Sequence, residues 1–166
     1  EQTYTGQNIC MAFGVSFVDL EVDVPLGKVR LKKVWAVHDS GHILNPQLAE
    51  AQVHGGVAMG LGYALGEEMR YDSETGRPLN NNFLDYKFPT AMDVPDIEVA
   101  FVETYEPSGP FGAKGLAEPP IIPQAAAVRN AILHATGVGF DTLPMNPQRL
   151  VERFVREGLI GGGKEA

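Results

Sequence analysis

Residues 45–68 read NPQLAEAQVHGGVAMGLGYALGEE and predict a long helix. The side chain of Asn45 can accept hydrogen bonds from the free amide groups of a first turn, and Pro46 suits the first helical position because it has no amide donor to lose. Apolar side chains then recur at near-helical spacing, at Leu48, Ala51, Val57, Ala58, Leu61 and Leu65. We expect this helix to end near Glu68.

Glycine is unusually frequent in this predicted helix. The five glycines are Gly55, Gly56, Gly60, Gly62 and Gly66. Each costs roughly 0.5–1 kcal/mol relative to alanine in a helix interior. Close packing against a neighbouring helix or sheet would offset that cost. Close approach of the helix backbone to a bulky ligand would also offset it, with Gln52 as the amide that hydrogen-bonds the ligand. The residues alone leave both explanations open.

Ahead of this helix, two extended segments flank a turn. Residues 12–24 alternate loosely between apolar and polar side chains, which is typical of a strand with one solvated face. Residues 25–27, Pro-Leu-Gly, have turn chemistry, and residues 29–37 resume an extended apolar pattern. The two segments therefore predict an antiparallel hairpin.

The segments after the helix mix strand and helix patterns. Residues 70–96 are rich in turn formers and predict a long ordered loop, and residues 97–102 predict a strand. Two further helices are expected, at about residues 121–136 and residues 147–156. Because this order lacks strict β-α-β alternation, it predicts an α+β fold with mixed layers: an antiparallel hairpin, a glycine-rich helix and a helix that follows a glycine- and proline-rich loop.

Length and composition limit the class of protein. With 166 residues, 44% hydrophobic and 20% charged, the chain can bury one core, so we assign residues 1–156 to one domain and residues 157–166 to a flexible tail. The net charge of −8 repels phosphate groups and argues against nucleic acid as a partner. No segment approaches the roughly 20 apolar residues that cross a bilayer, and no signal peptide opens the chain. We therefore expect no membrane span, a cytoplasmic location and, because no Met begins the sequence, a piece of a longer polypeptide.

Side chains able to hold a metal or a cluster are scarce. Cys10 is the single cysteine, so this chain alone cannot supply the thiolates of an iron–sulfur cluster. The histidines lack the paired spacing of a zinc site, and we interpret each as a surface or hydrogen-bonded residue: His38, His42, His54 and His134. No metal-ligating residues are therefore predicted.

A second unusual segment, residues 109–120, reads GPFGAKGLAEPP. Pro123 must fall among the opening residues of the following helix, so Glu118 lies just upstream of the helix, held extended by the proline after it. The helix dipole would stabilise its carboxylate, whereas burial near Phe111, Leu116 and Ile121 would raise its pKa. The alternative is an ordinary exposed acid near a helix N-terminus.

An ordered set of motifs resembles the molybdenum hydroxylases, the xanthine dehydrogenase and aldehyde oxidase family. The set comprises His38-Asp39-Ser40-Gly41, Asn45-Pro46, Gln52-Val53-His54-Gly55-Gly56, Gly60-Leu61-Gly62 and Lys114-Gly115-Leu116-Ala117-Glu118-Pro119-Pro120. The resemblance runs from about Phe13 to Phe154. The chain departs from the family pattern at His54, Met59 and Ala117, and none of these departures removes the catalytic group.

This resemblance implies that the chain is the C-terminal part of a molybdopterin-binding subunit and forms half of its cofactor-binding domain. Gln52, with Gly55 and Gly56, matches the segment that contacts the molybdenum–molybdopterin cofactor, and Glu118 matches the catalytic glutamate. The implied reaction hydroxylates an electron-poor carbon of a purine, another N-heterocycle or an aldehyde with oxygen from water. Glu118 would act in it as the general base.

The resemblance also implies a cofactor and partners. The cofactor is molybdenum-molybdopterin, with the cytosine dinucleotide form open, and the iron–sulfur clusters and FAD would lie on partner chains or domains. The remainder of the molybdopterin subunit would complete the site, so this chain alone would be inactive. Two alternatives stay open: a noncatalytic scaffold domain of the same fold that has lost the cofactor, and an unrelated acid-dependent hydrolase.

Overall fold

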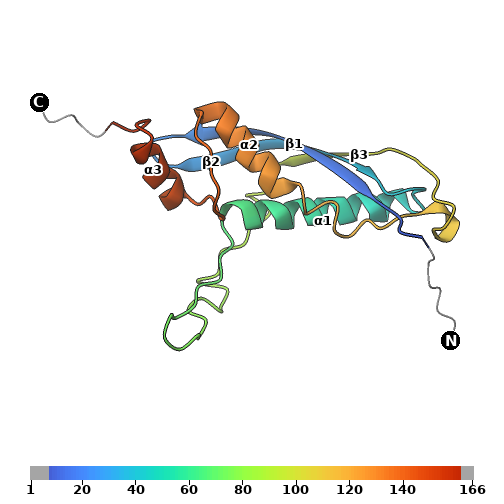
Figure 1. The fold of residues 1–166 in the computed structure, drawn as a ribbon, viewed down its shortest axis with the longest axis horizontal. Helices are drawn as coiled ribbons and strands as arrows, with labels where there is room; N and C mark the ends of the chain where they lie inside the picture. The colour runs from blue at the N-terminus through green and yellow to red at the C-terminus, as the bar shows by residue number, and fades with distance from the viewer. Residues whose placement is uncertain (1–7, 162–166) are drawn as a thin grey trace, which may run out of the picture.

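The computed structural model describes residues 8–161, which form three strands and three α-helices (Figure 1). In chain order the elements are β1 (Phe13–Asp23), β2 (Lys28–Asp39), α1 (Pro46–Leu65), β3 (Asp96–Phe101), the short 3-10 turn η1 (Pro110–Gly112), α2 (Gln124–Thr136) and α3 (Pro147–Arg156). The predicted α+β class is confirmed. Residues 1–7 of the predicted domain and residues 162–166 of the predicted tail lie outside the described residues.

The hairpin is antiparallel, as the sequence predicts. The register places Val15 opposite Val37. The turn closes where the amide of Gly27 donates to the carbonyl of Val24 at 3.2 Å, and Gly27 has a φ of 60°, which glycine adopts without steric cost. β3 then pairs with β2 in parallel, so β2, α1 and β3 form a β-α-β unit that the sequence pattern did not indicate.

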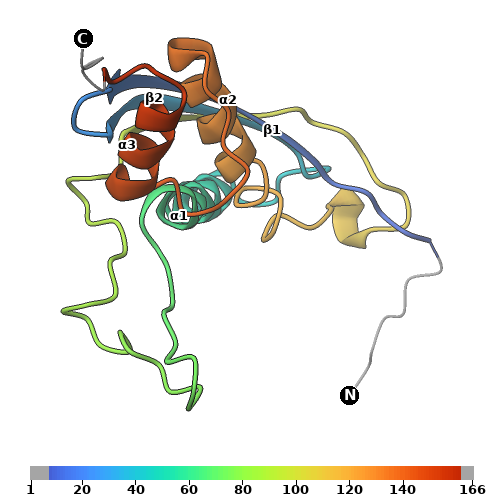
Figure 2. The same cartoon turned by 60° about the vertical axis from the view of Figure 1, so that its left-hand side comes forward.

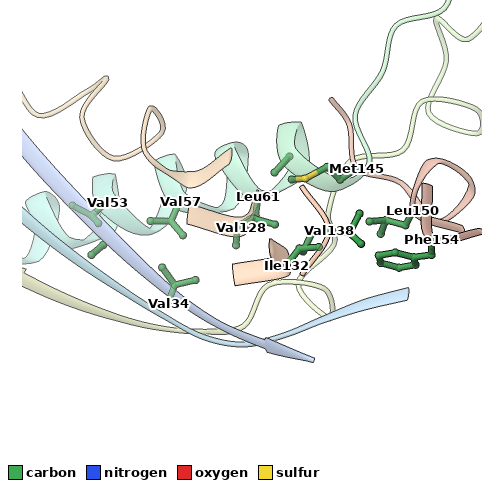
Figure 3. Close-up of a cluster of buried hydrophobic side chains, with 12 residues drawn as sticks. Val34, Val53, Val57, Leu61, Val128, Ile132, Val138, Met145, Leu150 and Phe154 are labelled. Atoms are coloured by element: carbon green, nitrogen blue, oxygen red, sulfur yellow. The ribbon is translucent and has the colours of Figure 1, made fainter. Parts of the chain in front are cut away.

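Helices α1 and α2 pack on one face of the three-stranded sheet (Figures 1 and 2). Alternate residues of β2, namely Val34, Ala36 and His38, are fully buried on the side that faces the helices. In Figure 3, the side chain of Val34 points toward α1, and α2 and α3 extend the same cluster. The cluster includes Val53, Val57, Leu61, Val128, Ile132, Met145, Leu150 and Phe154. The elements that carry the site residues described below are therefore packed around one hydrophobic core.

The ends of α1 follow from its backbone hydrogen bonds. The side chain of Asn45 accepts from the amide of Leu48 at 3.1 Å, so the predicted cap is confirmed. The expected end near Glu68 is wrong, because the helix ends at Leu65. The two amides after Leu65 both donate to the carbonyl of Gly62, at 2.9 and 2.8 Å, which closes the last turn early.

Helix α2 begins three residues later than expected. The expected start at Ile121 is wrong because Pro123 caps the helix and Gln124 is its first residue. The residues before Pro123 form a separate turn in which the carbonyl of Glu118 accepts from the amide of Ile121 at 3.0 Å. A proline-rich run cannot supply the amide donors that a continuous helix needs.

Residues 66–95 form the predicted long loop, which projects away from the sheet and helices (Figures 1 and 2). Its outer turn is closed by the carboxylate of Asp72, which accepts from the amide of Thr75 at 2.7 Å. At its base, the buried side chain of Asn80 donates to the carbonyl of Glu68 at 2.7 Å. Within residues 8–161, no helix is both long and apolar enough to cross a membrane.

Candidate active site

The glycine-rich side of α1 packs against the segment that follows Glu118. A β-carbon on Gly56 would lie 2.6 Å from the β-carbon of Pro120, and one on Gly60 would lie 2.7 Å from the side chain of Gln124. Both distances are shorter than any side chain tolerates, so glycine is required for this approach. Close packing therefore explains these two glycines. It also brings α1, which carries Gln52, against the segment that carries Glu118.

The substitution Gly56→Ala is expected to destabilise the domain by about 1–3 kcal/mol, because the added methyl group must push Pro120 away from α1. The matched control is Gly55→Ala, which adds the same group where no atom lies within 4 Å. The apparent melting temperature of the complete subunit, prepared without cofactor so that the proposed role of Gly55 does not contribute, would report the difference. Equal melting temperatures for the two variants would contradict the proposed packing.

The loop before Glu118 is tied to the end of β2 by backbone hydrogen bonds. Gly41 and Ala113 form an isolated antiparallel bridge. The amide of His42 donates to the carbonyl of Gly112 at 2.9 Å, and the amide of Lys114 donates to the carbonyl of Ser40 at 2.8 Å. These bonds attach the glycine-rich loop to the end of β2 as far as Lys114, which is four residues before Glu118.

An ion pair reinforces the same connection. The ammonium group of Lys114 lies 2.8 Å from the carboxylate of Asp39, and the two side chains are only 10% and 19% exposed. The carboxylate of Asp39 also accepts from the hydroxyl of Thr104 at 2.6 Å and from the amide of Gly41 at 3.1 Å. The hydrogen bond from Lys114, followed by the one from Thr104, lowers the pKa of Asp39 from 3.8 to about 2. Asp39 is therefore ionised at neutral pH and holds Lys114 in place.

Glu118 itself has a fixed backbone and an exposed side chain. Its carbonyl accepts from the amides of Ile121 and Ile122, at 3.0 and 3.2 Å. Its side chain makes no hydrogen bond or ion pair with any residue in the range 8–161, and Phe111 is 78% exposed. The described residues therefore do not form the apolar pocket around the Glu118 carboxylate that the sequence analysis considered. The carboxylate is free to act on a group from outside this chain.

Gln52 and Gly55 lie on an exposed part of α1. Within the described part of the chain, the amide group of Gln52 has no hydrogen-bond partner, and a β-carbon on Gly55 would meet nothing within 4 Å. A groove of about 610 Å³ lies at the C-terminal end of α1, but neither Gln52 nor Glu118 lines it. A free amide beside an open glycine fits a ligand that approaches the helix backbone. Of the three predicted cofactor residues, Gly56 alone has an internal packing role.

Gln124 is a site residue that the sequence analysis missed. It is fully buried, its amide group donates to the carbonyl of Pro120 at 2.8 Å, and its oxygen accepts from the hydroxyl of Ser16 at 3.0 Å. It therefore holds the segment after Glu118 against β1. A signal was present, because Gln124 precedes Val128 and Ile132 at four-residue spacing and so occupies the apolar face of α2.

Residues 1–95 match the family model of the molybdopterin cofactor-binding domain. The chain belongs to this family. It is 58% identical over 149 residues to a putative xanthine dehydrogenase molybdenum-binding subunit of Escherichia coli, and it covers 20% of that protein. It is 36% identical to the aldehyde oxidoreductase molybdenum-binding subunit of the same organism, with 86% of this chain and 20% of that protein covered.

Solved structures agree with this assignment to the molybdopterin cofactor-binding family. A Cu,Mo-CO dehydrogenase matches with a TM-score of 0.88 and 33% identity over 95% of this chain and 20% of that chain. The aldehyde oxidoreductase of Desulfovibrio gigas matches with a TM-score of 0.79 and 30% identity, over 87% of this chain and 15% of that one. The resemblance to the xanthine dehydrogenase and aldehyde oxidase family is thus confirmed. The chain spans about a fifth of the length of the curated relatives it matches.

Proposed function

We propose that this chain is part of a molybdenum hydroxylase that adds water-derived oxygen to an electron-poor carbon, with Glu118 as the general base. The observation that carries the proposal is the packing of Gly56 on Pro120, which joins the element bearing Gln52 to the segment bearing Glu118. The exposed Glu118 carboxylate and the free Gln52 amide support it further. The chemistry follows the family to which the chain belongs.

In the overall reaction a C–H bond of the substrate is replaced by C–OH, and two protons and two electrons leave. The bound molybdenum–pterin group supplies the redox chemistry. Glu118 accepts one of the protons at a carboxylate oxygen, which requires the ionised form before each turnover. Gln52 is proposed to hydrogen-bond the cofactor through its amide, and Gly55 to leave room for it. Gly56 contributes by keeping α1 against Pro120.

Further components complete the proposal. The remainder of the molybdopterin subunit encloses the site, because Glu118 and Gln52 are exposed on this chain and neither lines the groove at the C-terminal end of α1. We propose that iron–sulfur and flavin units on partner chains or domains carry the electrons away and that the enzyme works in the cytoplasm. The cytosine dinucleotide form of the pterin is the form to be tested. This chain by itself would then be inactive.

The experiment is to co-express this segment with the remainder of its subunit and partner chains and to measure bound molybdenum and the released nucleotide. Hydroxylation is then assayed on a panel of purines, other N-heterocycles and aldehydes. Stoichiometric molybdenum together with turnover of one class supports the proposal and names the substrate class. A folded complex without molybdenum would overturn it and favour a noncatalytic scaffold.

Replacing Gln52 by alanine is expected to weaken retention of the cofactor about 5- to 10-fold, the loss that removal of one hydrogen bond typically produces. The fold should be unaffected, because Gln52 is exposed and makes no internal hydrogen bond within residues 8–161. Molybdenum content after dialysis measures the effect. Gln47→Ala, an exposed glutamine on the same helix, is the matched control, and equal losses in both variants would contradict the role of Gln52.

A further inference from the structure

Strand alternation gives the two faces of the sheet different surroundings. On the inner face, Val34, Ala36 and His38 of β2 are fully buried against the helices. Within residues 8–161 neither ring nitrogen of His38 has a hydrogen-bond partner, so the interpretation of this histidine as a surface or hydrogen-bonded residue is wrong. The physical reason is the alternation itself, because it directs every second side chain of β2 into the core. The side chains between them lie on the outer face.

The outer face of the sheet is apolar over one half, which we call the outer apolar patch. The patch comprises Phe13, Val15 and Phe17 of β1, Trp35 and Val37 of β2, and Ala100 of β3. The register places Val15 opposite Val37 and Phe17 opposite Trp35. On this chain Val15 is 46% exposed and Phe17 is 60% exposed. Exposed apolar patches of this kind mark surfaces on which another part of a protein packs.

The other half of the same face is charged. It comprises Asp19, Glu21 and Asp23 of β1, Arg30 and Lys33 of β2, and Asp96 and Glu98 of β3. The change from apolar to charged falls within one residue pair of the same level in all three strands. The charges pair with one another, as where the ammonium group of Lys33 lies 2.7 Å from the carboxylate of Glu98. The charged half is therefore suited to water, and a covering partner belongs on the apolar half.

The outer apolar patch lies at the end of the sheet that meets the Glu118 segment. Gly14 of β1 is so close to this segment that a β-carbon on it would lie 3.1 Å from the carbonyl oxygen of Pro119. The ammonium group of Lys114, four residues before Glu118, lies 5.8 Å from the centre of the Phe13 ring. One continuous body of protein can therefore cover both the patch and the exposed Glu118 side chain.

We propose that the outer apolar patch is the surface on which the remainder of the molybdopterin subunit docks. The chain spans about a fifth of the length of its curated relatives, so the remainder is large enough to supply a further layer. A sheet with helices on one face buries its second apolar surface when another layer packs on it. The inference rests on the proposed role of the remainder in enclosing the site, but coverage of the patch can be measured without turnover.

The first test measures whether the patch is covered in the complete enzyme with its partner chains. Val15→Cys places a thiol in the patch. Val155→Cys is the matched control in α3, at the hairpin-turn end of the sheet (Figure 1), because Val155 is 49% exposed against 46% for Val15. Peptide mass spectrometry gives the rate of reaction with N-ethylmaleimide at each position. We expect residue 15 to react at least about tenfold more slowly, because a covered thiol reacts only after local opening. Equal rates overturn the proposal.

A charge within the patch should uncover it. Phe17→Glu puts a carboxylate where docking needs an apolar contact, and Leu26→Glu adds the same group in the hairpin turn, where Leu26 is 65% exposed against 60% for Phe17. In the Val15→Cys background, labelling of residue 15 should become about tenfold faster with Phe17→Glu and stay within about twofold with Leu26→Glu. An unchanged rate with Phe17→Glu, or the same increase in both variants, overturns the proposal.

Photo-crosslinking identifies what covers the patch. Phe17 is replaced by its photoreactive analogue benzoylphenylalanine, and the cross-linked peptides are sequenced. Peptides from the remainder of the same subunit support the proposal, whereas peptides from a partner chain or from a second copy of this segment overturn it. A patch covered by the remainder in a complex that binds no molybdenum would support the docking surface and reject only the proposed catalytic function.

Discussion

Replacing Glu118 by glutamine is expected to lower kcat of the complete enzyme by about 100- to 10,000-fold, the usual contribution of a positioned general base. Glutamine has the same shape and can still hydrogen-bond, but it cannot accept a proton. The side chain of Glu118 is exposed on this chain and makes no hydrogen bond within the described range, so folding should not change. Steady-state kinetics normalised to bound molybdenum measure the effect.

The control for Glu118→Gln is the same substitution at Glu74, an exposed acid in the outer turn of the projecting loop. It changes net charge equally and should leave kcat unaltered. Molybdenum content should also be unaltered in both variants, because the cofactor contact is assigned to Gln52. Retention of more than a tenth of kcat by Glu118→Gln would contradict the assignment of the base, since even the low end of the expected effect is larger.

The second large effect is expected from Lys114→Met, which leaves the carboxylate of Asp39 largely buried without its cation. Removing one partner of a buried ion pair costs about 3–5 kcal/mol of stability. Asp39 keeps its hydrogen bonds from Thr104 and Gly41, so we expect a loss near the lower end of that range. The readout is hydrogen exchange at the amide of residue 114, which donates to the carbonyl of Ser40. The free energy of the local opening that exposes this amide to exchange should fall by about 3 kcal/mol.

The same pair predicts a dependence on pH. The pKa of Asp39 is lowered from 3.8 to about 2 in the folded protein, so the ionised form stabilises the fold. This stabilisation, about 2 kcal/mol, is complete above about pH 4 and is lost as the pH falls toward 2. In Lys114→Met the acid-dependent loss of stability in that window should be smaller, because the main cause of the lowered pKa is gone.

The double variant Lys114→Met with Asp39→Asn separates charge burial from loss of packing. Asparagine is uncharged, so the double variant does not bury a carboxylate without its cation. It should therefore be more stable than Lys114→Met alone. If the double variant is equally or less stable, the effect arises from lost packing of the lysine stem, and the ion pair would not be the connection between β2 and the Glu118 loop.

Local patterns accounted for the elements. The cap at Asn45, the glycine turn at Gly27 and helix α3 all arise from contacts between residues close in the chain, and each was predicted correctly. The start at Gln124 was misplaced because the proline run before it lacks amide donors, and the end at Leu65 was misplaced because it depends on which of several competing carbonyl groups an amide selects. That choice depends on small energy differences, which residue types alone do not reveal.

Glu118 and Gln52 could be proposed from sequence because the motifs that contain them are local and distinctive. Their long-range supporting contacts could not. Gln124 holds the segment after Glu118 against β1 through its bond to Ser16, 108 residues away, and Gly14 lies beside Pro119 only because of how the hairpin packs.

The amino-acid sequence alone was therefore sufficient to predict the family, the hairpin, the helices and the two candidate site residues. Tertiary structure decided which glycines of α1 serve packing and which stay open, and it decided that a buried histidine lies under the Glu118 loop. The reason is physical. A pattern of side chains reports the environment that a residue prefers, whereas the contacts between distant segments depend on how complete elements pack, and a single β-carbon can permit or forbid that packing.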